Sequence, residues 1–204
     1  MNEREFLRLI ENELQRLMGK YAIVIERVLD DVYGRVASYL EDGFVNWEIL
    51  VNSEKLKEII REAYIEAGYF IHVRYSDQYD VEQARDEDSY TGIMLSLFAY
   101  RMMNAPDDLF TGETISRISA IIENQANVPQ SLRSANNRER AIGIARTEIG
   151  IAQSLAEWNT MSNSGLRKYW IGVLDDRIRD SHLEATQFYN ANNSIPVLDA
   201  FNVN

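Results

Sequence analysis

The chain has 204 residues, no cysteine and a formal net charge of −11. Hydrophobic residues make up 46% of it, which is enough for a core and argues against global disorder, while the lack of cysteine excludes disulfides and thiolate metal sites. The acidic surplus lies in residues 1–128, which hold 13 Lys/Arg and 24 Asp/Glu, and this charge argues against a general nucleic-acid binder. With neither a signal-peptide pattern nor a long apolar stretch, the sequence predicts a cytoplasmic protein without a membrane contact.

Apolar residues at helical spacing predict a series of helices in the first two thirds of the chain. The first covers residues 6–17 and is expected to stop near Gly19, and the second covers residues 24–40. Ser53 is the expected N-cap of a third helix, and Thr111 that of a later one. Between them, residues 93–103 form an apolar helix that ends before Pro106. Pro129 marks a further break, and Trp47, Trp158 and Trp170 are expected to anchor the core.

Residues 77–88 contain six acids and one arginine. Such a run is typical of a solvated loop or the start of a helix. The alternative is a cation site, although the spacing fits no calcium loop. His72, between apolar residues, is expected to be a packed or surface histidine rather than a ligand.

A long amphipathic helix is predicted over residues 138–158, with Glu148 in the middle of its apolar face. A buried carboxylate needs a partner, because an unpaired buried charge is very costly. The chain order suggests Arg177, Arg179 or His182, if the chain folds back. Glu148 is therefore read first as one half of an ion pair, and second as a catalytic or metal-binding carboxylate.

The turn-forming residues 161–165 separate this helix from a predicted strand over residues 166–174, which is apolar on both faces. A charged turn follows and ends in His182. Ile195, Val197 and Phe201 suggest another short strand. We therefore predict an α+β fold, predominantly helical, with an acidic N-terminal helical bundle (residues 1–128). Residues 129–204 supply a long helix and a small C-terminal β-containing module.

In this last segment the order of residues resembles the phage head morphogenesis proteins, the Mu F-like minor head proteins. The likeness covers about residues 140–201 and has four parts: an "ARTE"-like helix, a "K-x-W" strand, a "D-x-R-x-R-x-x-H" turn and a final "F" strand. The matching residues are Ile144-Ala145-Arg146-Thr147-Glu148, then Gly165, Lys168, Trp170, Leu174-Asp175, Arg177, Arg179 and His182, followed by Pro196-Val197 and Phe201.

The resemblance implies a virion component that acts in head assembly, and in DNA packaging or delivery, without enzymatic activity or a cofactor. The implied partner is the portal protein, with the major capsid or scaffold protein as a further one. The implied location is the capsid interior or portal vertex, and the host cytoplasm during assembly. Family members often carry cysteines at the charged turn and continue past the final Phe with a Gly and a Pro-Gly-Asp stretch, and this chain has neither feature.

Two alternative functions start from other residues. Glu148, Asp175, Asp176 and His182 could supply the ligands of a metal-assisted hydrolase. The sequence, however, has no H-E-x-x-H, G-x-S-x-G or P-loop motif. A DNA-contacting accessory protein is the other alternative, because a modest basic patch of Arg133, Arg138, Arg140 and Arg146, with Arg167 and Lys168, could hold phosphates.

Overall fold

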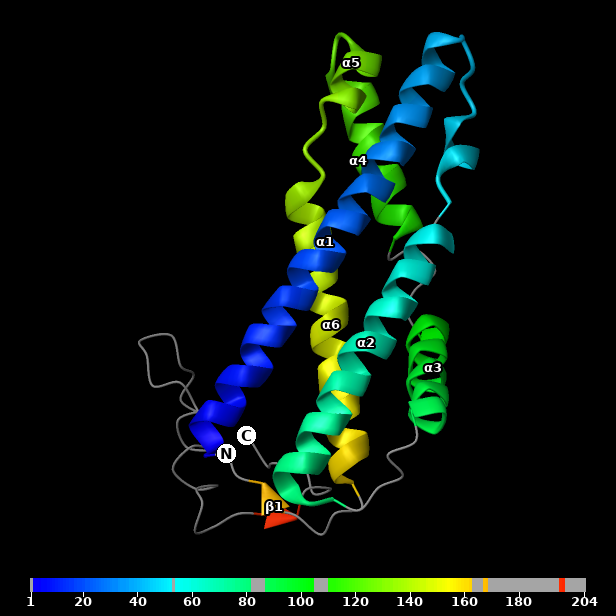
Figure 1. The fold of residues 1–204 in the computed structure, drawn as a ribbon. Coiled ribbons are helices and arrows are strands. Elements are labelled where there is room, and N and C mark those ends of the chain that lie inside the picture. The colour runs from blue at the N-terminus through cyan, green and yellow to red at the C-terminus, as the bar shows by residue number, and fades with distance from the viewer. Residues whose placement is uncertain are drawn as a thin grey trace.

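A computed structural model of the chain describes residues 2–52, 54–81, 87–104, 110–162, 167–168 and 195–196. Within these ranges the fold is predominantly helical, as predicted (Figure 1). The helices are α1 (Glu3–Glu41), the short 3-10 helix η1 (Trp47–Leu50), α2 (Glu54–Tyr79), α3 (Glu87–Asn104), α4 (Thr111–Asn124), α5 (Val128–Arg133) and α6 (Arg138–Met161).

The first helix is longer than expected. At its start, Asn2 and Glu5 form a capping box, in which each side chain bonds the other residue's backbone N–H. The helix then passes through Gly19 without a break, so the predicted stop at Gly19 is wrong. A glycine costs a helix about 1 kcal/mol, and the packing of the buried neighbours Leu17 and Tyr21 outweighs that cost. The helix ends at Glu41, close to the predicted end of the second segment.

Three long helices, α1, α2 and α6, lie side by side and form the body of the molecule (Figure 1). Their buried faces share one hydrophobic cluster, to which Tyr90 and Met94 of α3 also belong. Because α6 contributes to this cluster, the core crosses the predicted division at residue 128. That division stays a prediction.

A second cluster fills the far end of the molecule, at the top of Figure 1. There the last turns of α1 pack against η1, α4 and α5. Its buried residues are Val32, Tyr33, Val36, Ala37, Trp47, Ile118 and Leu132. Trp47 is thus a core anchor, as expected, whereas Trp158 is 56% exposed and its predicted core role is wrong. Trp158 follows the buried Ala156 by two residues, which is about 200° around the helix axis, so it lies on the side of α6 opposite to Ala145, Ala152 and Ala156.

Of the two predicted helix caps, the one at Ser53 is not tested and the one at Thr111 is wrong. Ser53 lies outside the described residues, and the first backbone N–H of α2, that of Glu54, donates to the Asn52 side chain. Thr111 is the first residue of α4 rather than its N-cap, and Phe110 occupies the cap position without a side-chain hydrogen bond. Phe110 packs into the first cluster, and this contact holds the beginning of α4 against the body.

Strand structure in the described residues is a single antiparallel pair, β1 (Arg167–Lys168) and β2 (Ile195–Pro196). Arg167 lies opposite Pro196, and Lys168 lies opposite Ile195. The rest of the predicted strand over residues 166–174, the charged turn and Phe201 fall outside the described residues.

Candidate functional site

Polar side chains interrupt the buried face of α6, the helix that carries the "ARTE"-like segment. Counted along the helix from its cap, they are Asn137, Arg140, Glu148, Glu157 and Thr160. The side chain of each contacts another helix, and that of Arg140 also contacts Phe110, the residue before α4. Hydrogen bonds fix direction and spacing more strictly than apolar contacts do, so this row sets how α6 sits in the body.

Glu148 is the most deeply buried carboxylate of the row, at 2% exposure. Its Oε2 accepts a hydrogen bond from the Tyr64 hydroxyl of α2 (3.1 Å), and its Oε1 accepts one from the Arg101 guanidinium of α3 (3.1 Å). Burial, and next the charge of Glu148, raise the pKa of the Tyr64 hydroxyl, which therefore keeps its proton as the donor. The carboxylate has a charged partner, as its position in the sequence required.

The described partner is not among the predicted ones. Glu148 pairs with Arg101, while Arg177, Arg179 and His182 lie outside the described part of the chain, so their pairing with Glu148 stays a prediction. Arg101 is the one charged residue in the run 93–103, and this isolated charge was the feature of the sequence that could have indicated a partner for Glu148. Periodicity alone could not show that α3 packs across α2 with Arg101 facing α6.

Arg140 ties the first turn of α6 to the start of α4. Its guanidinium donates to the Phe110 carbonyl (3.2 Å) and to the Thr114 hydroxyl (2.8 Å), and it lies 3.9 Å from the Glu113 carboxylate. Burial lowers the pKa of this guanidinium below its usual value. Nearby, the buried Asn137 side chain donates to Asp30 of α1 (3.0 Å).

The last turns of α6 bond to α2. Glu157 accepts hydrogen bonds from the Tyr75 hydroxyl and from Gln153, both at 2.8 Å. Thr160 lies 3.0 Å from His72 Nδ1, and the His72 ring stacks on Tyr90 with 3.8 Å between centroids. Burial raises the pKa of Tyr90 to about 12. His72 is 2% exposed, so of the two expected positions, packed or on the surface, it takes the packed one.

Of the residues that carry the family resemblance, the structure describes the side chains of those on α6, from Ile144 to Glu148. Glu148 is buried, and Arg146, two residues earlier on the same helix, is exposed. Lys168 lies in β1, where only its backbone is described. Trp170, Asp175, Arg177, Arg179 and His182 fall outside the described residues.

The predicted basic patch is divided by the structure. Arg140 is buried and therefore not available to a phosphate, whereas Arg133 is exposed and is paired with Glu41 through two hydrogen bonds of 2.6 and 2.5 Å. Arg138 and Arg146 are exposed, and they form no ion pair within the described ranges. These two arginines are what remains of the patch on α6.

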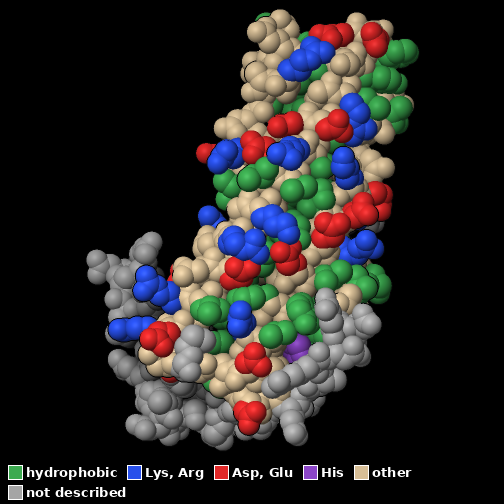
Figure 2. Space-filling model, viewed as in Figure 1, with side chains coloured by type: hydrophobic (Ala, Val, Ile, Leu, Met, Phe, Trp, Pro, Cys, Tyr) green, Lys and Arg blue, Asp and Glu red, His purple; other side chains and the backbone are tan. Residues whose placement is uncertain are grey.

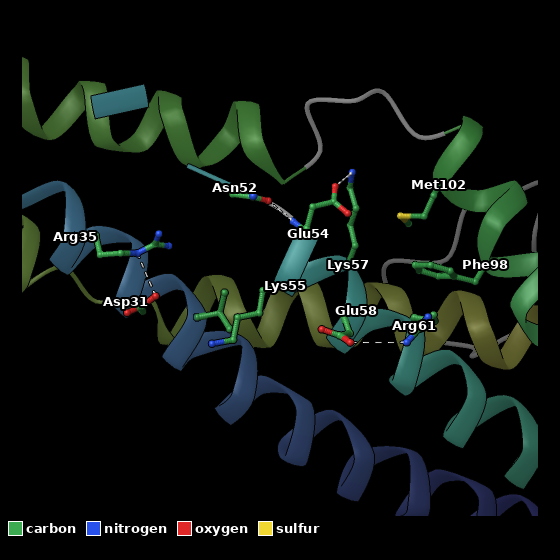
Figure 3. A pocket seen from close by; sticks show the side chains of 11 residues that line it. Asp31, Arg35, Asn52, Glu54, Lys55, Lys57, Glu58, Arg61, Phe98 and Met102 are labelled. Atoms are coloured by element: carbon green, nitrogen blue, oxygen red, sulfur yellow. Dashed lines mark hydrogen bonds and ion pairs between the residues drawn. The ribbon is translucent and has the colours of Figure 1, made fainter. Parts of the chain in front are cut away.

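An open groove lies between α1, the first turns of α2 and the end of α3, with a volume of about 950 Å³ (Figure 3). Phe98 and Met102 of α3 face the first turns of α2 across it. Six of its seven charged side chains pair along their own helices: Asp31–Arg35 (3.3 Å), Glu54–Lys57 (3.0 Å) and Glu58–Arg61 (3.9 Å). Exposed pairs of this kind contribute little energy. The described residues that line the groove include no serine, threonine or histidine to act as a nucleophile or base.

No group of three or more Asp, Glu or His side chains that could hold a metal ion occurs among the described residues. Asp175, Asp176 and His182, which the hydrolase alternative requires beside Glu148, lie outside them. The same part of the chain contains no helix with the length and apolarity needed to cross a membrane.

Comparisons of the chain with protein-family models, with curated proteins and with solved structures found no match.

Proposed function

We propose that this chain is a minor head protein of a bacteriophage, which acts in head assembly at the portal vertex without catalysing a reaction. The observation that carries the proposal is the order of residues from Arg146 to Phe201, which resembles the Mu F-like minor head proteins. The proposed location is the virion, with the host cytoplasm as the place of assembly. The proposed partners are the portal protein and, beside it, the major capsid or scaffold protein.

The packing of α6 supports this proposal. Glu148 of the "ARTE"-like segment is a buried structural residue that ties α6 to α2 and α3. A buried carboxylate that accepts from a tyrosine on one oxygen and from an arginine on the other is charge-paired within the core, which favours a structural over a catalytic role. Arg146, on the exposed side of the same helix, is open to a partner.

We further propose that the segments around β1 and β2 belong to the small β-containing module predicted from the sequence. The antiparallel pairing of Arg167–Lys168 with Ile195–Pro196 supports this, because it joins the two segments in which strands were predicted. In this arrangement α6 belongs to the helical body, and the proposed module follows it in the chain.

The shape and charge of the helical body suit contacts with other proteins. The body is long and narrow (Figure 1), and side chains of both charges are scattered over the face seen in Figure 2. Its acidic balance repels phosphate backbones, so we place its contacts on head proteins rather than on the packaged DNA.

Sedimentation velocity of the chain mixed with portal rings of the same phage tests the proposal. We expect the chain to co-sediment with the ring at a fixed stoichiometry, and to sediment alone beside rings of an unrelated phage. A folded chain that migrates separately from both rings contradicts the proposal.

A further inference from the structure

Large apolar side chains are exposed together at the end of the body that lies at the top of Figure 1, in the link between α1 and α2. Phe44 is 53% exposed, Val45 is 84% exposed and Ile49 is 65% exposed. We call these three residues the apolar tip. Figure 2, drawn from the same side, shows hydrophobic side chains gathered at this end of the molecule. Single exposed apolar residues need no explanation, but three within six positions do.

The apolar tip is held in a defined shape. The N–H of Gly43 donates to the Leu40 carbonyl (3.1 Å), and the N–H of Phe44 donates to the Tyr39 carbonyl (3.2 Å). Gly43 has a φ of 82°, so these bonds close α1 in a Schellman motif, which needs a left-handed residue at this place. The Phe44 ring stacks on Tyr39 with 4.7 Å between centroids.

The other side of the apolar tip is anchored by the core. Trp47, between Val45 and Ile49 in the chain, is 8% exposed and packs into the second hydrophobic cluster, and η1 forms one short turn around it. A surface fixed in this way loses little conformational entropy on binding. The apolar tip is thus a preorganised surface rather than a loose loop.

Acidic side chains lie beside the apolar tip, and two of them are ion-paired. From residue 36 to residue 54 the chain has four acids and no lysine or arginine, but Lys57 pairs with Glu54. Arg133 neutralises Glu41, while Asp42 and Glu48 form no ion pair within the described ranges. An apolar surface with an acidic rim is complementary to an apolar pocket with a basic rim. It is repelled by a second copy of itself, and by anionic lipid.

We propose that the apolar tip docks into an apolar pocket, rimmed by lysine or arginine, on a protein partner. This inference rests on the proposed function, and it assigns that pocket to the portal ring. Val45 and Ile49 supply the buried contact, and Asp42 and Glu48 supply the electrostatic rim.

The test measures the affinity of the full chain for immobilised portal rings by interferometry. The Val45→Ser/Ile49→Ser double variant is expected to bind about tenfold more weakly or worse, because it removes two apolar side chains that the docked state would bury. The matched control is Met103→Ser, which changes a side chain that is 80% exposed on α3, and it is expected to bind as the unaltered chain does. All these positions are exposed, so the melting temperature should not change.

A second pair of variants tests the acidic rim. Asp42→Lys/Glu48→Lys is expected to slow association and to weaken its dependence on salt. Glu11→Lys, an exposed change near the other end of α1, should leave binding at the level of the unaltered chain.

The outcomes separate this inference from the function on which it rests. If the unaltered chain does not bind portal rings, the proposed function fails and the inference fails with it. If it binds, and the Val45→Ser/Ile49→Ser variant binds equally well, the inference alone is overturned. Equal losses in Met103→Ser also overturn it. So does self-association of the unaltered chain that the double variant abolishes, because the occupant would then be a second copy.

Discussion

At the scale of single residues, the described structure is organised by carboxylates that tie helices together. Glu148 joins α6 to α2 and α3 inside the core, and Glu66 joins α2 to α1 at its edge. The two differ in burial, because Glu148 is 2% exposed while the Glu66 side chain is 35% exposed. Replacing the more deeply buried Glu148 should therefore lower the free energy of unfolding more than replacing Glu66.

Replacing Glu148 with alanine leaves Tyr64 and Arg101 without their shared acceptor. We expect the free energy of unfolding to fall by about 3 kcal/mol, which is typical when one partner of a buried ion pair is removed. Urea unfolding at neutral pH measures this change. Glu139→Ala, an exposed change on the first turn of the same helix, is the control and should have little effect.

The pairing itself can be tested by a double-mutant cycle. We expect Glu148→Leu/Arg101→Leu to lose less stability than the sum of the two single changes, because the double variant leaves no buried charge unpaired. Additive losses would show that the two side chains do not interact as described.

Glu66 predicts a dependence of stability on pH. Burial alone would raise the pKa of its carboxyl, but hydrogen bonds from Lys20 and Tyr21 outweigh burial and hold this pKa below its usual value. The stabilisation is therefore present above the unfolded-state pKa of about 4.3, and it is lost as the pH falls through the lower folded-state pKa. We expect Glu66→Gln to melt at a lower temperature than the unaltered chain at neutral pH.

In acid the two melting temperatures should converge, since the native carboxyl is then protonated as well. Thermal melts across this pH range measure the convergence. A gap that stays constant with pH would contradict the assigned ion pair.

The sequence showed that Glu148 needs a partner, but it could not show which partner. The requirement is local, because it follows from the apolar residues one turn away on the same helix. The answer depends on how α3 lies against α2 and α6, far away in the chain. Arg140 illustrates the same limit: by pattern it belongs to an exposed basic patch, and the packing of Phe110 and Thr114 buries it.

At the scale of helices, glycines mark where local preference and packing disagree. The helical pattern on both sides of Gly19 was correct, and the predicted break between them was wrong. Local preference disfavours glycine inside a helix, but the energy of the apolar stripe that runs on from Leu17 to Tyr21 decides the outcome. The end at Gly43 was predictable, because there a left-handed turn needs a glycine.

Two glycine substitutions test this account of the helices. A Cβ at Gly19 would meet no atom within 4 Å, whereas a Cβ at Gly68 would lie 2.3 Å from Cε of the buried Met94. We expect Gly19→Ala to raise the free energy of unfolding by about 0.5 to 1 kcal/mol, because alanine has the better helix propensity. We expect Gly68→Ala to lower it, since Met94 must move within a packed core. Chemical denaturation of both variants measures the change in the free energy of unfolding. Changes of the same sign in the two variants would contradict the packing of α3 on α2.

At the scale of the whole molecule, the described part of the chain is a long helical body that carries two different features. α6 carries the "ARTE"-like segment along the body, and the apolar tip lies where α1 turns toward α2 (Figure 1). The predominance of helices could be predicted, because periodicity is a local signal. The side-by-side packing of α1, α2 and α6 could not, because it depends on contacts between residues more than 80 positions apart, such as Tyr64 with Glu148.

The central claim, that the chain is a minor component of a phage head, is tested most directly by quantitative mass spectrometry of purified heads. Heads of the phage that encodes the chain should contain it at a fixed ratio to the portal protein and far below the major capsid protein. Heads assembled without the portal should lack it. A chain that is abundant in infected cells but absent from purified proheads and virions would contradict the claim.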